Sequence, residues 1–525
     1  MIPSDMVTVS TRGDGKKGRP LNRPWKKLIT VGRAYELLRT DLRKHLDKAQ
    51  REIGWEYCRF HALFHDDMAV VKKVKDDIRF QWRTIGEIYD TLLDVGLRPF
   101  AELNPMPNAL ASGERTIFWY KMNVTPPKDF AEWENLIEEY ARFCIRRYGR
   151  AEVRKWYFEL WNEPNMPGFW TGGFDGYVKL YEHTVAALHR VDRNLRVGGP
   201  ATAGADWIPE FAGLCAKRGL PVDFFSTHRY PQDAFTPIGG ERPAGFDIEK
   251  DFDDSFRRVR DDVKSSAYPD AEIHWTEWNC QAATGPDEVS WGFNRYVESS
   301  YAGSFIARHC TELDNACDSM GWWALSDIFE EPGPQLHPFN CGYGLISVDG
   351  LAKASYNAFS FLNQMDGDLL EVDLGEDAPE GCGGIACESQ GVTRLLLWNH
   401  PALSNPNAPV WKSRVASPDA EALSTIRVIE RGKGSVVEVW EQIGCPANLN
   451  KQTHALLEAA SQPGCRLLPQ ENSEHPFALA PYSVALCEWT AKEPMAIGKG
   501  MQAYGKSAKK QDEDILETLL SGKDA

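Results

Sequence analysis

The segment Trp156-Tyr157-Phe158-Glu159-Leu160-Trp161-Asn162-Glu163-Pro164-Asn165 carries the clearest structural signal in the chain. Its first part is rich in aromatic residues and alternates in character, which predicts a β-strand. Pro164 has no N–H to donate to a neighbouring strand, so the strand must end before it. Glu163 is therefore predicted to stand at the carboxyl end of a strand.

Strand-like segments of this kind recur along the chain. From about residue 28 to 365, short β-branched or aromatic runs alternate with longer amphipathic segments, which is the pattern of repeated βα units. The predicted strands are 28–31, 56–60, 98–103, 156–161, 196–198, 222–227, 272–276 and 321–324. The predicted helices between them include 34–53, 82–95, 130–148, 177–191 and 296–310.

An open doubly wound sheet would alternate in the same way. Such a sheet normally carries a Gly-rich phosphate turn after its first strand, and the sequence has neither G-x-G-x-x-G nor a P-loop. The fold class predicted is therefore α/β, a (β/α)8 TIM barrel. In such barrels the carboxyl ends of the strands form the catalytic face.

The chain of 525 residues is longer than one hydrophobic core usually supports, which indicates an accessory domain. After about residue 365, short strands predicted at 393–398, 424–428, 435–440 and 482–489 indicate a β-sandwich. The extended run Met6-Val7-Thr8-Val9-Ser10 could pair with that sandwich. The predicted division is an N-terminal extended segment (1–27), the barrel (28–352), a helical connection (353–365), the sandwich (366–495) and a disordered tail (496–525).

Composition excludes several functions. The formal charge of −16 argues against nucleic acid, whose binding depends on clustered Lys and Arg. The local basic stretch from Arg12 to Lys27 has no interleaved aromatic platform and is interpreted as a solvated arm. Because the N-terminus lacks an apolar signal region and no stretch is apolar enough to span a membrane, we expect a cytoplasmic protein without membrane partners. Nothing in the sequence indicates an oligomeric state.

Metal binding is not indicated either. The twelve cysteines are dispersed over the chain and mostly flanked by apolar residues, so buried thiols are expected. Cys382 and Cys387 form a lone C-x4-C without a second ligand pair. His61 and His65 likewise lack a third ligand. We therefore expect no metal and no organic cofactor.

A second segment, Ala271-Glu272-Ile273-His274-Trp275-Thr276-Glu277-Trp278-Asn279, also ends a strand on a carboxylate among aromatic residues. It falls at the seventh strand position, and Glu163 at the fourth. Two carboxylates at these strand ends could face each other across the barrel mouth, which is the pair that glycosidic cleavage requires. Glu159 lies within its strand instead, where a barrel-filling, hydrogen-bonding role is expected.

The sequence around these residues resembles that of glycoside hydrolase family thirty-nine, the β-xylosidase and α-L-iduronidase family. Trp161-Asn162-Glu163-Pro164-Asn165 matches the Asn-Glu-Pro signature of the wider superfamily, which places its acid/base on strand four and its nucleophile on strand seven. The resemblance runs from about Val31 to Phe361. Further matching stretches are Asn123-Val124-Thr125-Pro126-Pro127-Lys128-Asp129, Arg196-Val197-Gly198-Gly199-Pro200, Val222-Asp223-Phe224, His228-Arg229-Tyr230 and the segment from Trp323 to Glu331.

The resemblance implies roles for individual residues. Glu163 would be the acid/base and Glu277 the nucleophile, with Asn162 bonding the sugar 2-OH. His228 and Tyr230 would flank the nucleophile, and Tyr230 would position it through its hydroxyl. The residues implied to line the subsite of the non-reducing sugar are His61, Phe118, Trp323, Glu330 and Glu331.

Some of these assignments leave alternatives open. Without the resemblance, Phe118 and Trp323 could be core aromatics and His228 a structural histidine. Arg59 has no firm assignment, because the family has Gly where this chain has Phe60.

The predicted function is a retaining, exo-acting β-D-xylosidase that cleaves xylo-oligosaccharides or small β-xylosides by double displacement. The alternatives are another retaining glycosidase of the superfamily, such as an α-L-arabinopyranosidase or α-L-iduronidase, and a non-catalytic carbohydrate-binding protein. An acidic pocket containing Glu330 and Glu331 would repel a hexuronate, and Phe118 would disfavour a C6 group. Only Arg59 and Arg229 are evident as cations for a uronate, unless acidic neighbours pair with them.

Overall fold

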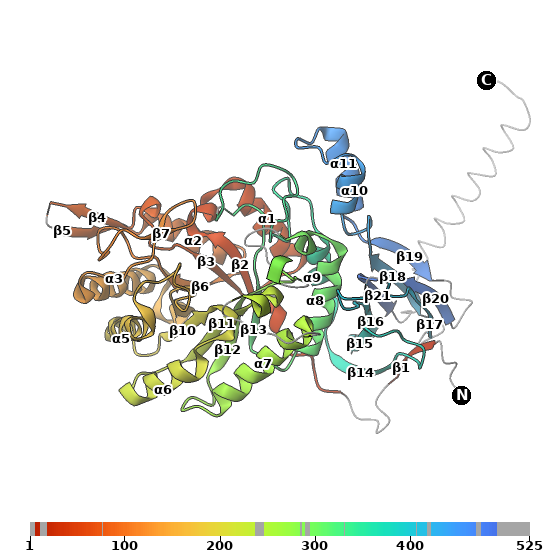
Figure 1. Ribbon diagram of the computed structural model, residues 1–525, viewed down its shortest axis with the longest axis horizontal. Helices are drawn as coiled ribbons and strands as arrows, with labels where there is room; N and C mark the ends of the chain where they lie inside the picture. Colours follow the sequence, from red (N-terminus) through yellow and green to blue (C-terminus); the bar gives the residue numbers. More distant parts are fainter. Residues whose placement is uncertain are drawn as a thin grey trace, which may run out of the picture.

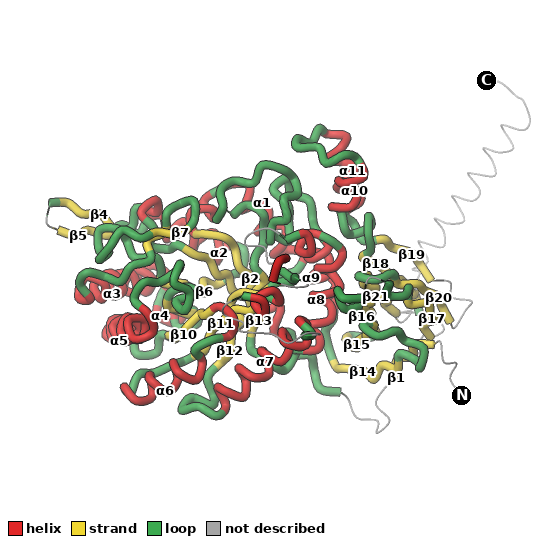
Figure 2. Tube along the Cα trace, viewed as in Figure 1, coloured by secondary structure: helices red, strands yellow, loops and turns green. Residues whose placement is uncertain are grey.

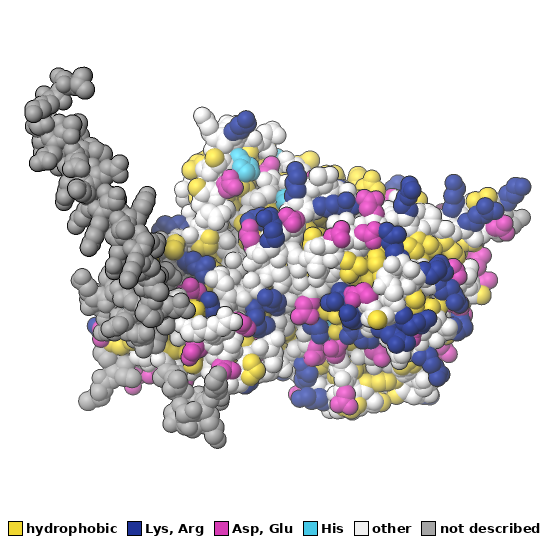
Figure 3. All heavy atoms as spheres, turned by 180° about the vertical axis from the view of Figure 1, so that it is seen from behind, with side chains coloured by type: hydrophobic (Ala, Val, Ile, Leu, Met, Phe, Trp, Pro, Cys, Tyr) yellow, Lys and Arg dark blue, Asp and Glu magenta, His cyan; other side chains and the backbone are white. Residues whose placement is uncertain are grey.

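The chain folds into a barrel and a β-sandwich, which lie at the two ends of the molecule in Figure 1. The computed structural model describes residues 6–10, 18–75, 77–236, 246–283, 286–288, 294–329, 331–405, 407–416, 422–468 and 474–490. Among them, no helix combines the length and apolar character needed to cross a membrane. Figure 3 shows acidic and basic side chains interspersed on one face of the molecule.

The barrel prediction is confirmed: eight parallel strands close into a ring in the order β10-β11-β12-β13-β2-β3-β6-β9. They are β2 (Leu28–Arg33), β3 (Tyr57–His61), β6 (Arg98–Leu103), β9 (Tyr157–Leu160), β10 (Arg196–Thr202), β11 (Phe224–Arg229), β12 (Glu272–Trp278) and β13 (Ser319–Trp322). Helices surround this ring, as Figure 2 shows. They include α1 (Thr40–Glu52), α2 (Arg83–Asp94), α3 (Phe130–Tyr148), α5 (Gly173–Val191), α6 (Ile208–Arg218), α7 (Ile248–Lys264) and α8 (Ser300–Glu312).

The barrel interior changes from apolar to polar along the strands. Near the amino ends, one packed layer consists of Leu28, Tyr57, Phe100, Tyr157 and Phe224. Side chains two residues apart on a strand point to the same face, so the next layer is formed by the residues two positions further on. These are all polar and buried: Thr30, Arg59, Glu102, Glu159 and Ser226. The apolar floor thus supports a charged layer just below the barrel mouth.

The sandwich is built from strands that surround a second hydrophobic core. They are β14 (Asp368–Asp373), β15 (Cys382–Ser389), β16 (Val392–Asn399), β17 (Trp411–Ala416), β18 (Leu423–Ile429), β19 (Gly464–Leu468), β20 (Glu474–Leu479) and β21 (Ser483–Thr490). The N-terminal β1 (Met6–Ser10) pairs antiparallel with β14 and parallel with β17. The start of the chain therefore completes a domain made otherwise from its end.

One predicted strand is wrong. Residues 435–440 do not form a strand, because α10 (Val437–Gln442) begins within them and α11 (Lys451–Ala460) follows. The Ser435 hydroxyl donates to the Glu438 carboxylate at 2.8 Å, and Ser followed three residues later by Glu is typical of a helix start. Val436 and Val437 pack with Phe339 and Leu457. The apolar residues that suggest a strand in the sequence thus belong to a helix and its start.

Helix α9 (Ala354–Gln364) connects the barrel to the sandwich. The boundaries predicted at residues 27, 352, 365 and 495 stay predictions, and the tail 496–525 lies outside the described residues.

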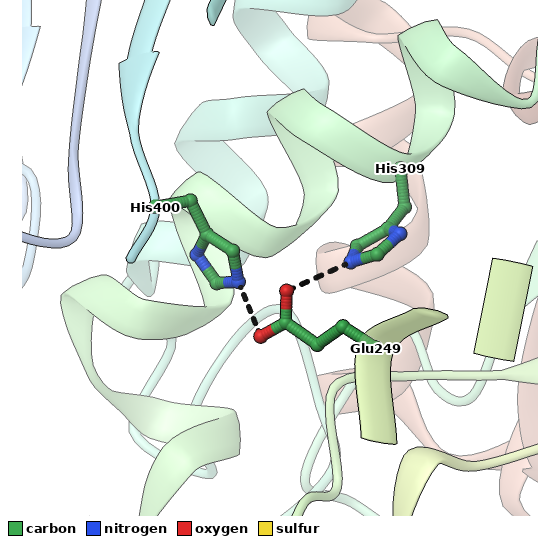
Figure 4. Close-up of side chains that lie close together, drawn as sticks. All are labelled: Glu249, His309 and His400. Carbon is green, nitrogen blue, oxygen red and sulfur yellow. Dashed lines mark hydrogen bonds and ion pairs between the residues drawn. The ribbon is translucent and has the colours of Figure 1, made fainter. Parts of the chain in front are cut away.

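A buried polar cluster joins the two parts of the molecule (Figure 4). Glu249 from α7 lies between His309 of α8 and His400, which directly follows β16 of the sandwich. Glu249 Oε1 is 2.9 Å from His400 Nε2, and Glu249 Oε2 is 2.6 Å from Arg308 Nη1. His309 Nδ1 is 2.7 Å from the Asp253 carboxylate. Because these groups are buried, each of them depends on the others for its partner.

Protonation of His309 should therefore stabilise the fold. Burial lowers the pKa of His309, but Asp253 and Glu249 outweigh it and raise that pKa from 6.5 to about 9. The stabilisation is fully present below pH 6.5 and is lost as the pH rises through 9.

We expect His309→Gln to lower the melting temperature most at pH 6 and least at pH 10, because the variant lacks the charged partner of Asp253. The loss at pH 6 should be on the order of 3 kcal/mol. Thermal unfolding at both pH values measures this, with His454→Gln, whose side chain is 39% exposed, as the control. An equal loss of stability at both pH values would show that the proton on His309 is not what stabilises the junction.

Candidate active site

Two carboxyl groups meet at the mouth of the barrel, as the sequence predicts. Glu277 lies in β12, and Glu163 follows the end of β9. The backbone at Glu163 is left-handed (φ 45°), and its N–H donates to the Ala201 carbonyl at 2.8 Å, which turns the side chain toward the mouth. One oxygen of each carboxyl group and a ring nitrogen of His228 lie within 4.8 Å of one another. This closeness is typical of retaining rather than inverting glycosidases.

Arg59 supplies a buried cation to this site, a role that could not be assigned firmly from the sequence. It is fully buried, and its guanidinium contacts Glu102 at 2.7 Å, Glu159 at 2.5 Å and Glu277 at 2.7 Å. It also donates to the Asn162 side-chain oxygen at 2.9 Å. Burial lowers the pKa of Arg59, but the three carboxylates raise that pKa by more than burial lowers it. The guanidinium therefore stays charged. Arg59 therefore orients both Glu277 and Asn162.

Glu277 receives further donors at its carboxylate. The Tyr230 hydroxyl donates to Oε2 at 2.8 Å, and His61 Nε2 lies 3.3 Å from Oε1. Burial raises the pKa of Glu277, while Arg59, His61 and Tyr230 oppose that rise. The donors all favour the ionised form, which is the form that a nucleophile needs.

Glu163 has the opposite surroundings. Burial raises its pKa well above the usual range, and the charge of Glu277 raises it further. Its hydrogen-bond partner is His228, whose Nδ1 lies 3.0 Å from Oε1. Burial lowers the pKa of His228 well below its usual value, so this imidazole is neutral and brings no charge that would ionise Glu163. Glu163 therefore keeps its proton near neutral pH.

His228 lies beside both carboxyl groups. The resemblance implies that it flanks the nucleophile and contributes to substrate binding. The structure places its Nδ1 closer to Glu163, at 3.0 Å, than to Glu277, at 3.7 Å. It is fully buried, with Thr276 on its other nitrogen at 3.2 Å. His228 thus lies behind the carboxyl groups instead of in the cavity wall.

A cavity of about 480 Å³ opens above the two carboxyl groups. Of the predicted substrate-binding residues, those that line it are His61, Phe118, Asn162, Tyr230, Trp323 and Glu331. Glu330 lies outside the described residues. The lining residues that sequence reasoning missed are Ile117, Met166, Gly168, Phe169, Ala203, Gln232, Asp233, Gln281, Pro332 and Tyr343. Ile117 lies in β7 (Thr116–Ile117), Ala203, Gln232 and Asp233 lie in short 3-10 helices, and the others lie on loops. No motif marks them in the sequence.

The polar end of the cavity is crowded with acids. Burial, with Glu277 and Glu102 nearby, raises the pKa of Glu331 to about 8. Burial also raises the pKa of Glu102 well above its usual range, although Arg59 opposes this. With one guanidinium among these acids, some of them hold protons at neutral pH. The predicted role of Glu159 is confirmed: it is fully buried and accepts from Arg59 and, at 2.9 Å, from the Thr276 hydroxyl.

Two groups among the described residues place three possible metal ligands together: Glu163, His228 and Glu277 at the mouth, and Glu249, His309 and His400 at the junction. In each group an arginine already contacts one carboxylate, Arg59 on Glu277 and Arg308 on Glu249. A divalent cation would have to displace that guanidinium or lie beside it. Both groups are therefore better suited to holding protons than to holding metal.

A parallel (β/α)8 barrel with two close carboxyl groups at the carboxyl ends of strands four and seven defines a glycoside hydrolase. The chain belongs to glycosyl hydrolases family 39, whose sequence profile matches residues 8–473.

Several known proteins are similar to this chain over most of its length. A β-xylosidase of Caldicellulosiruptor saccharolyticus is 38% identical over 454 residues, which cover 85% of this chain and 90% of that protein. A β-xylosidase of Geobacillus stearothermophilus is 32% identical over 466 residues, covering 87% and 89% of the two chains. The crystal structure of a monomeric β-xylosidase from Caulobacter crescentus CB15 aligns with a TM-score of 0.80 at 29% identity, covering 94% of this chain and 100% of that one.

Removing the Tyr230 hydroxyl should lower catalytic activity without disturbing the fold. In Tyr230→Phe, the Glu277 carboxylate loses a donor, so its pKa rises and the acidic limb of the kcat/KM profile moves to higher pH. We expect kcat to fall on the order of 100-fold. The matched control is Tyr268→Phe, whose hydroxyl donates to the Leu220 carbonyl away from the cavity. An unmoved acidic limb would mean that Tyr230 does not hold the carboxylate.

Proposed function

We propose that this glycoside hydrolase is a retaining, exo-acting β-D-xylosidase, with Glu163 as its acid/base and Glu277 as its nucleophile. The observation that carries the proposal is the unequal environment of two neighbouring carboxyl groups. Glu277 contacts a guanidinium, whereas Glu163 contacts a neutral imidazole. One group is thus suited to attack as an anion and the other to donate a proton.

In the first step, a Glu277 oxygen attacks the anomeric carbon as the glycosidic C–O bond breaks. Glu163 gives its proton to the departing oxygen, and a glycosyl ester forms on Glu277. The loss of its proton is favoured as Glu277 becomes an uncharged ester, because the repulsion between the two carboxylates disappears. In the second step, Glu163 removes a proton from water, and the water oxygen displaces Glu277 with a second inversion.

The polar end of the cavity would hold the terminal sugar. Asn162, fixed by Arg59, is placed to bond the 2-OH, while His61, Trp323 and Glu331 line the same end. The Trp323 and His61 rings contact each other in a tilted arrangement, with ring centroids 4.6 Å apart. All of these residues except Glu331 are at most 2% exposed, so the end is closed, as an exo-acting enzyme requires.

The charge of the cavity favours a neutral pentoside over a uronide. Arg59 is occupied by three carboxylates, and Arg229 is paired with Asp251. No Lys or Arg is found among the described residues that line the cavity. A hexuronate would bring its carboxylate beside Glu277 and Glu331, where burial makes repulsion stronger than in water. The α-L-iduronidase alternative is therefore disfavoured, whereas α-L-arabinopyranosides, which lack C6 as xylosides do, remain acceptable.

A non-catalytic carbohydrate-binding protein is the alternative from another class. Binding alone does not need two buried carboxyl groups of opposed protonation, which cost free energy to keep together. The relatives named β-xylosidase that span nearly the whole chain also support an enzyme of this kind.

Variants of the two glutamates should separate their roles. We expect Glu277→Ala to lose all turnover, because no nucleophile remains. Glu163→Ala should still cleave xylosides whose leaving group is acidic enough to depart unprotonated, and added azide should restore turnover and yield the β-xylosyl azide. The exposed Glu182→Ala is the control. Equal losses on activated and unactivated leaving groups in both variants would contradict the assignment.

A panel of aryl glycosides tests the sugar preference. We expect kcat/KM to be highest for the β-D-xyloside, lower for the α-L-arabinopyranoside, and at least about tenfold lower for the β-glucoside, because a C6 group must fit within the closed end formed by His61, Trp323 and Glu331. The α-L-iduronide should be cleaved least, because no free cation faces its carboxylate among the described residues. A glucoside or iduronide in first place would refute the xylosidase proposal.

A further inference from the structure

The cavity has two chemically different ends. The end around Arg59 and Glu277 is charged and closed. The other end is formed by Ile117, Phe118, Met166 and Phe169, which are half-buried and carry no polar side-chain group apart from the weakly polar thioether of Met166. We refer to these four residues as the apolar rim. Arg59, His61 and Glu277 at the closed end are at most 4% exposed, whereas these four residues are half-buried, so they face the entrance.

The apolar rim lies on the leaving-group side. Glu163 must protonate the departing oxygen, so the leaving group extends past Glu163 toward the entrance. The chain turns directly after Glu163, with Met166 N–H donating to the Glu163 carbonyl and Phe169 N–H to the Met166 carbonyl, both at 2.9 Å. This turn places Met166 and Phe169 beside the path of the leaving group. The acid/base and half of the apolar rim thus belong to one short segment.

The other half of the rim comes from the hairpin of β7 (Thr116–Ile117) and β8 (Met122–Asn123). The Phe118 and Phe169 rings meet edge to face with centroids 5.3 Å apart, which joins the two halves. Trp119 N–H donates to the Glu331 carbonyl at 2.8 Å, and the Trp119 side chain is 56% exposed. A large exposed aromatic residue next to a cavity extends its apolar surface.

Several polar side chains around the cavity are engaged within the protein. Asn165 exchanges hydrogen bonds with the backbone of Ala203, at 2.9 and 3.0 Å. Asp233 accepts from Tyr230 N–H at 2.9 Å, and Gln281 donates to the Tyr343 hydroxyl at 2.8 Å. A second xylose at this end would leave several hydroxyl groups facing carbon atoms, which costs binding free energy.

We propose that the apolar rim is a subsite for a hydrophobic leaving group, so that the enzyme's preferred substrates are β-xylosides of aryl-alkyl, phenolic or terpenoid-like alcohols instead of xylobiose. The inference rests on the proposed xylosidase function and adds the class of leaving group to it. The chemistry is unchanged: the C1–O bond breaks, and the Glu163 proton goes to the oxygen of the hydrophobic alcohol. Apolar area buried against the rim supplies the additional affinity.

The experiment compares substrates that share the sugar and a similarly basic alkoxide: methyl β-D-xyloside, 2-phenylethyl β-D-xyloside and xylobiose. With wild-type enzyme, kcat/KM for the phenylethyl xyloside should exceed the values for both others by at least about tenfold. Dissociation constants of the uncleaved methyl and phenylethyl 1-thio-β-D-xylosides should differ by a similar factor in calorimetry, which tests binding without chemistry.

Variants of the rim residues test whether the preference for the phenylethyl xyloside originates at the apolar rim. In Phe169→Ala and Met166→Ser, the ratio of kcat/KM between phenylethyl and methyl xyloside should fall toward one. The control is Leu467→Ser on β19 of the sandwich, an apolar side chain that is 68% exposed, in which the ratio should equal that of wild type. The wild-type comparison needs no variant, so a variant that fails to fold does not decide the outcome.

The outcomes separate a failure of the apolar subsite from a failure of the proposed xylosidase function. If no β-xyloside is cleaved, the proposed function fails. If β-xylosides are cleaved but xylobiose matches or exceeds the phenylethyl xyloside, the function stands and the apolar subsite is refuted. An undiminished ratio in both folded rim variants would also refute it, because the preference would then originate elsewhere.

Discussion

The ion pairs of Arg59 are the interaction on which the active site depends. A single guanidinium, fully buried in the barrel, is held by Glu102 and Glu159 and holds Glu277 and Asn162 in turn. Removing one partner from such a buried group typically costs about 3–5 kcal/mol, because the charges left behind have neither water nor a counter-charge. The strand layers make this possible, since each of Arg59, Glu102 and Glu159 stands two residues beyond a floor residue of the same strand.

The position of this one cation makes the two carboxyl groups chemically unequal. Glu277 is within its reach, whereas Glu163, on the other side of the mouth, meets a neutral His228. Burial raises the pKa of both groups, so the difference between them comes from their partners. The fold therefore prepares an anion and an acid at adjacent positions, and Arg59 is the one Lys or Arg that contacts either carboxyl group among the described residues.

The sequence predicted the parts of the structure that depend on local pattern. The eight barrel strands and the two glutamates follow from alternation, Pro164 and a recurring strand-end motif. The strand prediction for the segment 435–440 is wrong because its valines and tryptophan fit a strand as well as a helix, and the helix is decided by packing against Phe339 and Leu457. The partners of Arg59 and the loop residues of the cavity could not be predicted, because they come from segments far apart in the chain that only the closed barrel brings together.

The apolar rim connects binding to the protonation of Glu163. Glu163 already owes its raised pKa first to burial, and its side chain is still 13% exposed. A hydrophobic leaving group on Met166 and Phe169 would remove water from the same place, because the turn that carries these residues begins at Glu163. Exclusion of that water raises the pKa of a carboxyl group further. The proposed substrate thus buries Glu163, the group that must stay protonated until the glycosidic bond breaks. Glu277 keeps its charge through Arg59, which does not line the cavity and is not contacted by the leaving group.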